Sequence, residues 1–283
     1  MQNTLFDREP AWLMDALRAI ATYRFLTVVQ LAALVDVPAA EVTPLVEALT
    51  ARGVLLVLEP VHRALEAGAP AYALTRSGAR LLARGGSASV DVPDRRKSLL
   101  MLAHDLARNT LGVVFHVLAR RGQLSLLRFE MARARIADAV QVLVRGRVVR
   151  VPLVADAYAV LGPAEHPTAL LVEVDRGTVS AKRMREKFLG YYRWWYEHGP
   201  LRRFGLQSLR IATIASTTAR MQRLRDLARE ATGGHAPGLF WFGTESLVSL
   251  AAPETLLAPM WTTAGDEPPR ALLQTNSTSG ADG

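Results

Sequence analysis

The segment Thr168-Ala-Leu-Leu-Val-Glu-Val-Asp175 decides the fold, because it is almost continuously apolar and yet ends on two acids. A short apolar run of this kind is typical of a strand that is buried on both faces of a sheet. Asp156 lies in the preceding apolar segment, residues 148–161, so three carboxylates are expected on two neighbouring strands. Buried carboxylates need a partner, and a divalent metal most naturally gathers three of them. The sequence therefore suggests a site that cleaves phosphodiester bonds.

Helices and strands are expected on both sides of this segment. The pattern predicts a long helix over 97–120, strands over 123–129, 140–144 and 148–161, a helix over 179–198, a strand over 209–215, a helix over 217–231 and a last strand over 239–242. Arg145-Gly146-Arg147 is a compact turn between two of these strands. This order predicts an α/β or α+β fold with a central mixed sheet flanked by helices.

The chain up to residue 85 has a different pattern. Apolar residues at helical spacing predict three helices, of which the second is capped by Thr27 and the third starts at Pro38 and ends at Arg52-Gly53. Two strands, over 54–58 and 71–74, and a helix near Thr75 follow. Three helices followed by a β-hairpin predict a winged helix-turn-helix domain, which commonly binds DNA.

The third of these helices lacks the basic side chains that usually contact DNA. Its surface offers Glu41, Thr43, Glu47 and Thr50. Direct reading of bases by basic side chains is therefore not visible, and a protein-interaction or dimerisation module is the alternative. Phosphate contacts in this part of the chain are expected from Arg52, Arg63, Arg76 and Arg80.

Length and composition indicate two domains. The chain has 283 residues, whereas one domain typically needs roughly 100 to 150 residues. The stretch from Gly85 to Pro93 is small and polar, as flexible linkers are. We expect a winged-helix domain over 1–85, a linker over 86–96, the α/β domain over 97–264 and a disordered tail over 265–283.

Charge and residue usage narrow the class of protein. The formal net charge is +8, which suits a polyanionic partner such as DNA but is also common for solubility alone. There is no cysteine, so disulfides and thiolate metal sites are excluded. No stretch approaches the roughly 18 uncharged apolar residues that a membrane span needs. The first residues lack the pattern of a signal peptide, and we expect a cytoplasmic protein without a membrane partner.

Four features carry a resemblance to a known family. They are Glu130 after the first strand of the second domain, Val151-Pro-Leu-Val-Ala-Asp-Ala157, Leu171-Val-Glu-Val-Asp-Arg-Gly-Thr178, and Arg185-Glu-Lys-Phe-Leu-Gly-Tyr-Tyr192. In order and spacing they resemble the replication-relaxation family. The resemblance implies an amino-terminal winged helix joined to a domain similar to the PD-(D/E)XK nuclease fold.

The resemblance also implies roles for individual residues. In a nuclease of this fold, Asp156 and Glu173 would bind Mg²⁺ or Mn²⁺, and Glu130 would complete an acidic cluster that also contains Asp175. Lysine normally stands two residues after the acid on the same strand, where it helps to orient the attacking water. Asp175 stands there in this chain, which leaves catalysis open. Lys187, on the following helix, can replace that lysine or can belong to a solvated basic stripe.

Alternatives are open for the acids. Instead of binding metal, they can pair with Arg150, Arg176 or Arg183. Asp105, on the long helix, presents the same choice, and pairing with Arg108 or Arg120 is favoured there over a role as a further ligand.

Arginines and aromatic residues around the acids have two explanations as well. Arg145, Arg147, Arg150 and Arg183 are expected to hold backbone phosphates, although a solvated edge strand would carry arginines too. The aromatic residues between 191 and 196 can stack on unpaired bases, but their helical spacing favours packing on the sheet for at least half of them.

These observations lead to one hypothesis and one alternative. The hypothesis is a DNA-binding protein of plasmid or chromosomal replication or DNA processing, with a divalent-metal-dependent endonuclease or nickase activity. The alternative is a non-enzymatic winged-helix regulator of transcription or replication, in which a degenerate nuclease-like domain serves dimerisation. Candidate partners are DNA, a second copy of the chain, and a replication or relaxase protein.

Overall fold

The computed structural model of the chain describes residues 10–58, 69–84, 95–131, 138–144, 146–177 and 179–272. The chain divides into two compact units, Met1–Val117 (unit 1) and Leu118–Gly283 (unit 2). The expected linker, residues 86–96, lies almost entirely outside the described residues. No single helix among the described residues has the length and apolar character that crossing a membrane requires.

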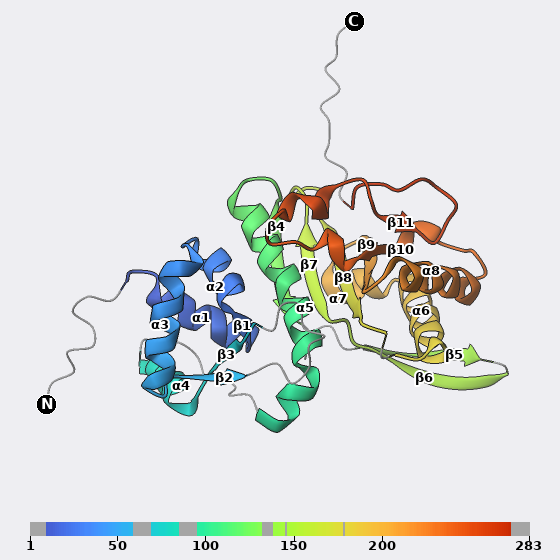
Figure 1. Cartoon of the computed structure of the whole chain (residues 1–283). Helices are drawn as coiled ribbons and strands as arrows, with labels where there is room; N and C mark the ends of the chain where they lie inside the picture. The colour runs from blue at the N-terminus through green and yellow to red at the C-terminus, as the bar shows by residue number, and fades with distance from the viewer. Residues whose placement is uncertain are drawn as a thin grey trace, which may run out of the picture. The chain divides into compact units, whose positions relative to one another are not determined.

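Unit 1 combines short helices with a three-stranded antiparallel sheet in the order β1-β3-β2 (Figure 1). Its elements are α1 (Leu13–Tyr23), β1 (Leu26–Thr27), α2 (Val28–Val35), α3 (Ala39–Ala51), β2 (Leu55–Leu58), β3 (Ala71–Leu74), α4 (Arg76–Arg84) and most of α5 (Arg95–Arg120). Each helix and strand that the sequence predicts here is present, with ends that differ by a few residues.

Polar contacts explain how the helices of unit 1 are held. Thr27 caps α2 through a capping box, because its hydroxyl accepts from the Gln30 amide and its own amide donates to the Gln30 side chain. Gln30 also donates to the Leu106 carbonyl and the Thr110 hydroxyl of α5. Asn109, fully buried on α5, donates to the carbonyls of Tyr23, the last residue of α1, and Phe25. The long helix is therefore part of the packing of unit 1.

Unit 2 is built on a six-stranded mixed sheet in the order β11-β10-β9-β8-β7-β4, with β8, β9 and β10 parallel. A separate two-stranded ribbon is formed by β5 and β6. The elements are β4 (Leu126–Met131), β5 (Asp138–Val144), β6 (Arg147–Leu153), β7 (Ala157–Leu161), β8 (Thr168–Asp175), α6 (Ala181–Tyr196), α7 (Gly199–Phe204), β9 (Ser208–Ala215), α8 (Thr218–Thr232), β10 (Phe240–Thr244) and β11 (Thr262–Thr263), with short 3-10 turns between β9 and β11.

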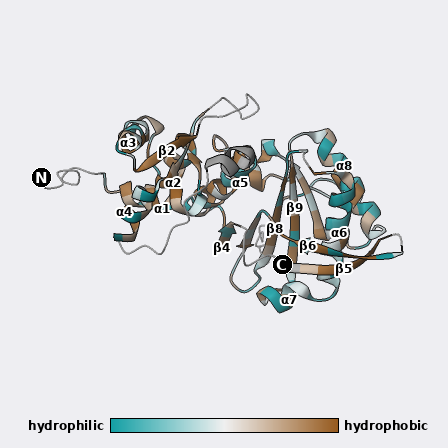
Figure 2. Cartoon of the chain, turned by 90° about the horizontal axis from the view of Figure 1, so that it is seen from below, coloured by the Kyte–Doolittle hydropathy of each residue, from teal (hydrophilic) through white to brown (hydrophobic). Residues whose placement is uncertain are grey.

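Helices α6 and α8 cover one face of this sheet (Figure 1). Leu171 and Ile211 from the strands pack there with Phe188 and Tyr191 of α6, all with at most 1% of their surface exposed. The central strands are largely apolar, apart from a few polar positions such as the acids at the end of β8, while the outer sides of α6 and α8 are hydrophilic (Figure 2). Every second residue of β8, including Glu173 and Asp175, therefore points toward the two helices.

The sequence prediction fails where it assigns one strand to residues 148–161. The chain instead leaves β6 at Leu153 and enters β7 at Ala157, and Asp156 lies in the break. The reason is pairing: β6 pairs with β5 in the ribbon, whereas β7 pairs with β4 and β8 in the main sheet. A uniformly apolar run does not reveal such a change of partner.

Two smaller differences concern other parts of unit 2. The short helix α7 was not predicted by periodicity, because six residues are too few for a helical pattern. The tail was expected to be disordered from residue 265, but residues 265–272 pack on unit 2. Trp261 pairs with Arg270, and Leu272 is only 1% exposed.

Candidate functional site

Asp156 holds its place through the backbone of the neighbouring strand. Its amide donates to the Val172 carbonyl at 2.8 Å, and its Oδ2 accepts from the Val174 amide at 2.8 Å. The carboxylate thus satisfies a strand amide at the point where the pairing of β7 with β8 ends. This contact also fixes Asp156 beside Glu173, the residue between its two backbone partners.

Glu173 is a buried acid with two side-chain donors from α6. Its exposure is 4%, Lys187 Nζ lies 2.5 Å from its Oε2, and the Tyr191 hydroxyl lies 2.5 Å from its Oε1. Lys187 and Tyr191 are four residues apart and so lie on one side of the helix. The side chain of Lys187 is 24% exposed, which places it at the edge of the core rather than in a solvated stripe. We call Asp156, Glu173, Lys187 and Tyr191 the Glu173 cluster.

The environment of Glu173 changes its acidity. Burial raises the pKa of Glu173 from 4.5 to about 7, the charge of Lys187 lowers this pKa, and the charge of Asp156 raises it. Burial also raises the pKa of the Tyr191 phenol well above its ordinary value, with the Glu173 charge acting in the same direction. The tyrosine is therefore neutral at physiological pH and can only donate its proton to the carboxylate.

Asp175 has a different partner. Arg220, in the first turn of α8, donates from Nε at 2.8 Å and from a terminal nitrogen at 3.0 Å to its two oxygens. The amide of Gly177 adds a third donor at 2.9 Å, and Asp175 is 3% exposed. None of the arginines considered in the sequence analysis is its partner, and Arg176 instead donates to Glu245 at 2.9 Å. Asp175, Arg220 and Gly177 form the Asp175 cluster.

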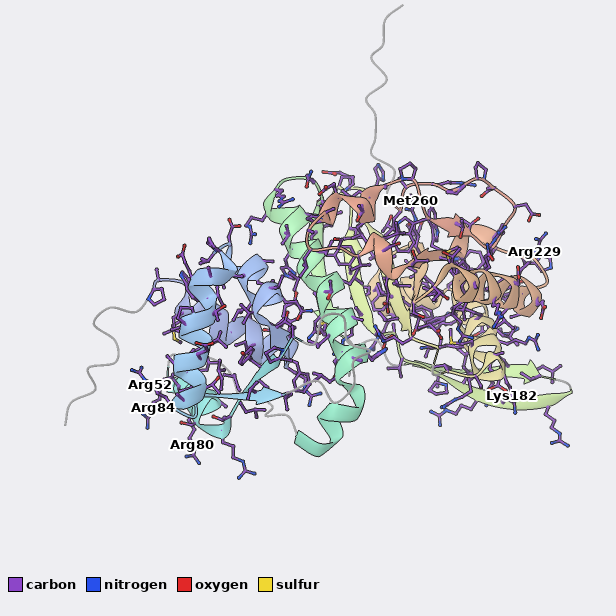
Figure 3. All side chains as sticks on the ribbon, viewed as in Figure 1. Arg52, Arg80, Arg84, Lys182, Arg229 and Met260 are labelled. Carbon is purple, nitrogen blue, oxygen red and sulfur yellow. The ribbon has the colours of Figure 1, made fainter. Side chains whose placement is uncertain are left out.

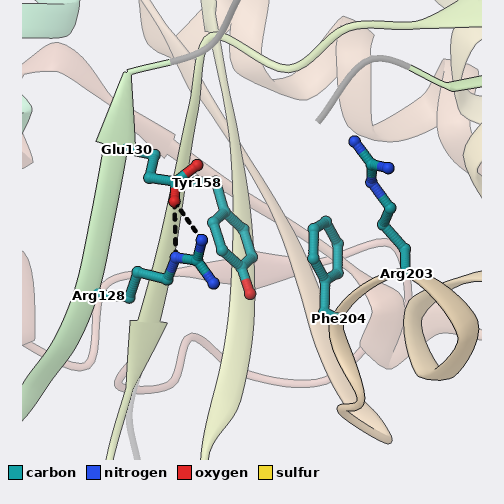
Figure 4. A pocket seen from close by; sticks show the side chains of 5 residues that line it. All are labelled: Arg128, Glu130, Tyr158, Arg203 and Phe204. Carbon is teal, nitrogen blue, oxygen red and sulfur yellow. Dashed lines mark hydrogen bonds and ion pairs between the residues drawn. The ribbon is translucent and has the colours of Figure 1, made fainter. Parts of the chain in front are cut away.

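Glu130 lies on β4, and β7 separates it from β8. Arg128 Nε donates to its carboxylate at 2.6 Å. The pair lines a cavity of about 180 Å³ together with Tyr158, Arg203 and Phe204 (Figure 4). Tyr158 stacks on Phe204 with the ring centres 4.4 Å apart. Among the described residues, no three His, Asp or Glu side chains are arranged as a group that could hold a metal ion.

Asp105 pairs with an arginine of its own helix, the alternative that its sequence context favours. Its carboxylate pairs with Arg108 at 3.0 Å, and both side chains are buried within unit 1. The expectation that the long helix pairs its own acid is therefore confirmed.

The expected phosphate-binding arginines fall into two surfaces. Arg52 caps the end of α3, and Arg76 and Arg80 lie four residues apart on α4, all exposed. Figure 3 shows Arg52, Arg80 and Arg84 at the same end of unit 1. In unit 2, Arg147 and Arg150 are exposed on β6, and Arg183 is exposed on α6. Arg63 and Arg145 lie outside the described residues.

The closeness of α3 and α4 has a local cause. The Thr75 hydroxyl contacts the Gly53 carbonyl at 2.6 Å, and the Gly78 amide donates to that hydroxyl at 3.1 Å. A side chain at Gly78 would meet the Val54 carbonyl at 2.4 Å, so only glycine allows this approach. The first turn of α4 therefore packs against the end of α3, next to Arg52.

Two residues of the site were not predicted from the sequence. Tyr191 was expected simply as a core aromatic, although its spacing of four from Lys187 was the available signal. Arg220 carries no signal of its own, because it lies 45 residues from Asp175 and only the parallel pairing of β8 with β9 brings the two together.

These elements define a mixed α/β protein with a buried acid, lysine and tyrosine cluster at the end of a central strand. The family model described as replication-relaxation matches residues 17–209, and the chain belongs to that family. Neither the curated proteins nor the solved structures contain a match to this chain.

Proposed function

We propose that this protein binds DNA in plasmid or chromosomal replication or DNA processing, and that unit 2 is a divalent-metal-dependent endonuclease or nickase. The observation that carries the proposal is the 2.5 Å contact between Lys187 and Glu173. An ammonium group beside the acid of a nuclease-like site stabilises the negative charge that develops on the phosphate. Membership of the replication-relaxation family supports a role in replication or DNA processing.

Asp156 and Glu173 fit Mg²⁺ or Mn²⁺ as a pair of ligands. Mg²⁺ is commonly bound by one or two carboxylates, with waters and substrate phosphates completing its shell. The charge of Asp156 raises the pKa of Glu173, and a divalent cation would relieve this repulsion. Strand β7 separates Glu130 from Glu173, and Arg220 donates to both oxygens of Asp175, so we limit the ligand pair to the adjacent Asp156 and Glu173. When bound, the metal would neutralise the scissile phosphate and lower the pKa of a water.

The protein's own groups have separate tasks in this proposal. Tyr191 holds one oxygen of Glu173, so that the carboxylate keeps a fixed orientation. Lys187 neutralises the other oxygen before substrate arrives and is then the donor for the attacking water or a phosphate oxygen. Asp156, tied to the backbone of β8, cannot turn away from Glu173.

We further propose that unit 1 is a winged helix and that unit 2 has the PD-(D/E)XK nuclease-like arrangement. The α3–α4 surface supports DNA binding by unit 1, because Arg52, Arg76, Arg80 and Arg84 are exposed there and none is paired with an acid among the described residues. Four such exposed cations are better suited to contacts with the phosphates of the DNA backbone than to reading base edges. Work on plasmid or chromosomal DNA would place the protein in the cytoplasm.

Nicking of supercoiled plasmid tests the catalytic proposal. In Mg²⁺ or Mn²⁺ we expect relaxed circles from the native protein and a loss of at least about 100-fold with Glu173→Gln, Asp156→Asn or Lys187→Met. The matched control is Lys182→Met, which removes the same charge from an 82% exposed position of the same helix (Figure 3). Its rate should stay within about twofold of the native rate. Circular dichroism of each variant verifies the fold.

Two outcomes would count against the nuclease. One is the absence of metal-dependent cleavage of supercoiled, linear and single-stranded DNA. The other is cleavage that survives Glu173→Gln and Asp156→Asn, since a contaminating nuclease would then be the source. Calorimetric titration with Mn²⁺ adds a readout that does not need turnover, and binding should disappear in both variants.

A non-enzymatic regulator is the second candidate function. One observation favours it: both oxygens of Glu173 already accept hydrogen bonds, as a purely structural acid would require. In this version unit 1 binds DNA or a replication or relaxase protein, and unit 2 supports dimerisation. The regulator predicts salt-dependent DNA binding without cleavage, and a dimer in sedimentation experiments that lasts after Mn²⁺ is removed.

A further inference from the structure

The β5–β6 ribbon carries an apolar pair on its outer face. Leu143 and Val148 are direct partners in the ribbon, and each is 67% exposed. The two residues stand one position before and after the turn, where Gly146 has φ of +76°. Large aliphatic side chains at such exposure gain little hydrophobic free energy from folding, and they would gain more from a partner that covers them. The tip of the ribbon therefore has the properties of a contact surface.

The opposite face of the ribbon is anchored in unit 2. Val140, Val142, Val151 and Leu153 on that face are at most 9% exposed and belong to the core beneath α6. Gly190 of α6 makes room for them, since a side chain there would approach Leu153 and Val151 to 3.0 Å. An isolated two-stranded ribbon is marginal in water, so this anchoring is what holds its tip away from the core (Figure 1).

The charges beside the apolar pair indicate the kind of partner. Arg150 lies on the same face as the apolar pair, is exposed and is not paired with an acid among the described residues, whereas Arg147 pairs with Val144 and belongs to the opposite face. The outer face of the ribbon holds Ala139, Gln141, Leu143, Val148, Arg150 and Pro152, without an acid. A second copy meeting this face through the same residues would bring no acid to pair with Arg150. An anionic partner would supply the opposite charge.

We propose that the β5–β6 ribbon is a DNA-binding arm that inserts Leu143 and Val148 between base pairs from the minor groove, with Arg150, on the same face, on a flanking phosphate. The inference rests on the proposed DNA binding. Apolar wedges of this kind partly unstack a base step and kink the duplex, and the bent DNA then contacts more protein surface. The arm would thus deform DNA, whichever surface provides most of the affinity.

Energy transfer between dyes at the two ends of a short duplex measures the bend. The native protein should raise the transfer efficiency on binding, and Leu143→Ser with Val148→Ser should remove at least half of that rise. Both side chains are exposed, so the double variant should fold normally. The matched control is Met260→Ser, which removes a 58% exposed apolar side chain elsewhere on unit 2 (Figure 3) and should leave the bend unchanged.

A further variant examines the cation. Arg150→Gln should weaken binding and reduce the slope of log affinity against log salt by about 1, as one lost phosphate contact requires. The variant with Leu143→Ser and Val148→Ser should leave this slope unchanged, because it removes no charge.

Each other outcome has a definite meaning. If the native protein binds DNA without bending it, or if the variant with Leu143→Ser and Val148→Ser bends it equally, the proposed arm is refuted. DNA binding itself would still stand. Absence of DNA binding by the native protein would overturn both proposals. If the native protein is a dimer in sedimentation experiments and the variant with Leu143→Ser and Val148→Ser is a monomer, this face joins two copies. That result would also overturn the arm.

Discussion

The two acid clusters at the end of β8 differ in how each charge is compensated. Asp175 has a guanidinium that donates to both of its oxygens and a backbone amide in addition. Glu173, two residues earlier on the same face, has one ammonium group and one phenol. The bidentate arginine pair is geometrically fixed, whereas a lysine on a flexible stem can leave its partner.

This difference separates a structural acid from a reactive one. Burial raises the pKa of Glu173 to about 7, so that Glu173 changes its charge near neutral pH. Perturbed acidity of this kind is common at functional sites. Because the folded protein holds this proton more tightly than the unfolded chain, the contribution of Glu173 to stability is greatest below pH 4.5 and is lost as the pH rises through about 7.

Arg220→Met should have the largest effect on stability. It leaves the Asp175 carboxylate, 2% exposed in its side chain, without its cation. Removing one partner of a buried ion pair costs about 3 to 5 kcal/mol, which urea denaturation would measure. Arg223→Met, at an exposed position of the same helix, should stay within about 0.5 kcal/mol of the native protein. Equal stability of the two variants would refute the structural role of the Asp175 cluster.

Lys187→Met should have a smaller effect that depends on pH. The lysine lowers the pKa of Glu173, so its loss raises this pKa further and penalises the charged form. We expect a cost of about 2 to 3 kcal/mol at pH 8 and less than about 1 kcal/mol at pH 5, where Glu173 is protonated in both proteins. Denaturation at the two pH values measures the difference. A cost independent of pH would mean that Lys187 acts through packing alone.

The sequence predicts most elements of the fold because each is encoded locally. The apolar face of α3 and the capping threonine of α2 depend on residues within a few positions of one another. The break at Asp156 is different, since the run on either side is equally apolar and only the choice of strand partner creates it. Periodicity detects a strand but not which neighbour it pairs with.

The site shows the same division. The pairing of Lys187 with Glu173 was predictable, since the helix that follows a strand can return to its end. The partner of Asp175 was not, because β9 and the start of α8 must first be placed beside β8. Glu130 was expected in the same acidic cluster, but the order of strands puts β7 between it and Glu173.

Tyr191→Phe should have a moderate effect within the Glu173 cluster. It removes a hydrogen bond to a charged carboxylate and leaves the ring in the core. Hydrogen bonds to charged groups contribute about 1.5 to 3 kcal/mol, and we expect the low end of this range at pH 8 and less at pH 5. The hydrogen bond lowers the pKa of Glu173, so that pKa should rise. A carboxyl carbon shift measured by NMR across pH 5 to 9 reports this titration directly.

Asp156→Asn should have the smallest effect and the opposite sign. Asparagine keeps an oxygen that accepts from the Val174 amide, so the end of β7 stays in place while the charge is removed. Because the charge of Asp156 raises the pKa of Glu173, the same NMR titration should move down from about 7. Stability at pH 8 should rise by under about 1 kcal/mol, even though the proposed metal site is destroyed. An unchanged titration would mean that Asp156 and Glu173 do not share one electrostatic site. The Glu173 cluster would then resemble the Asp175 cluster, an acid paired only with its own cation.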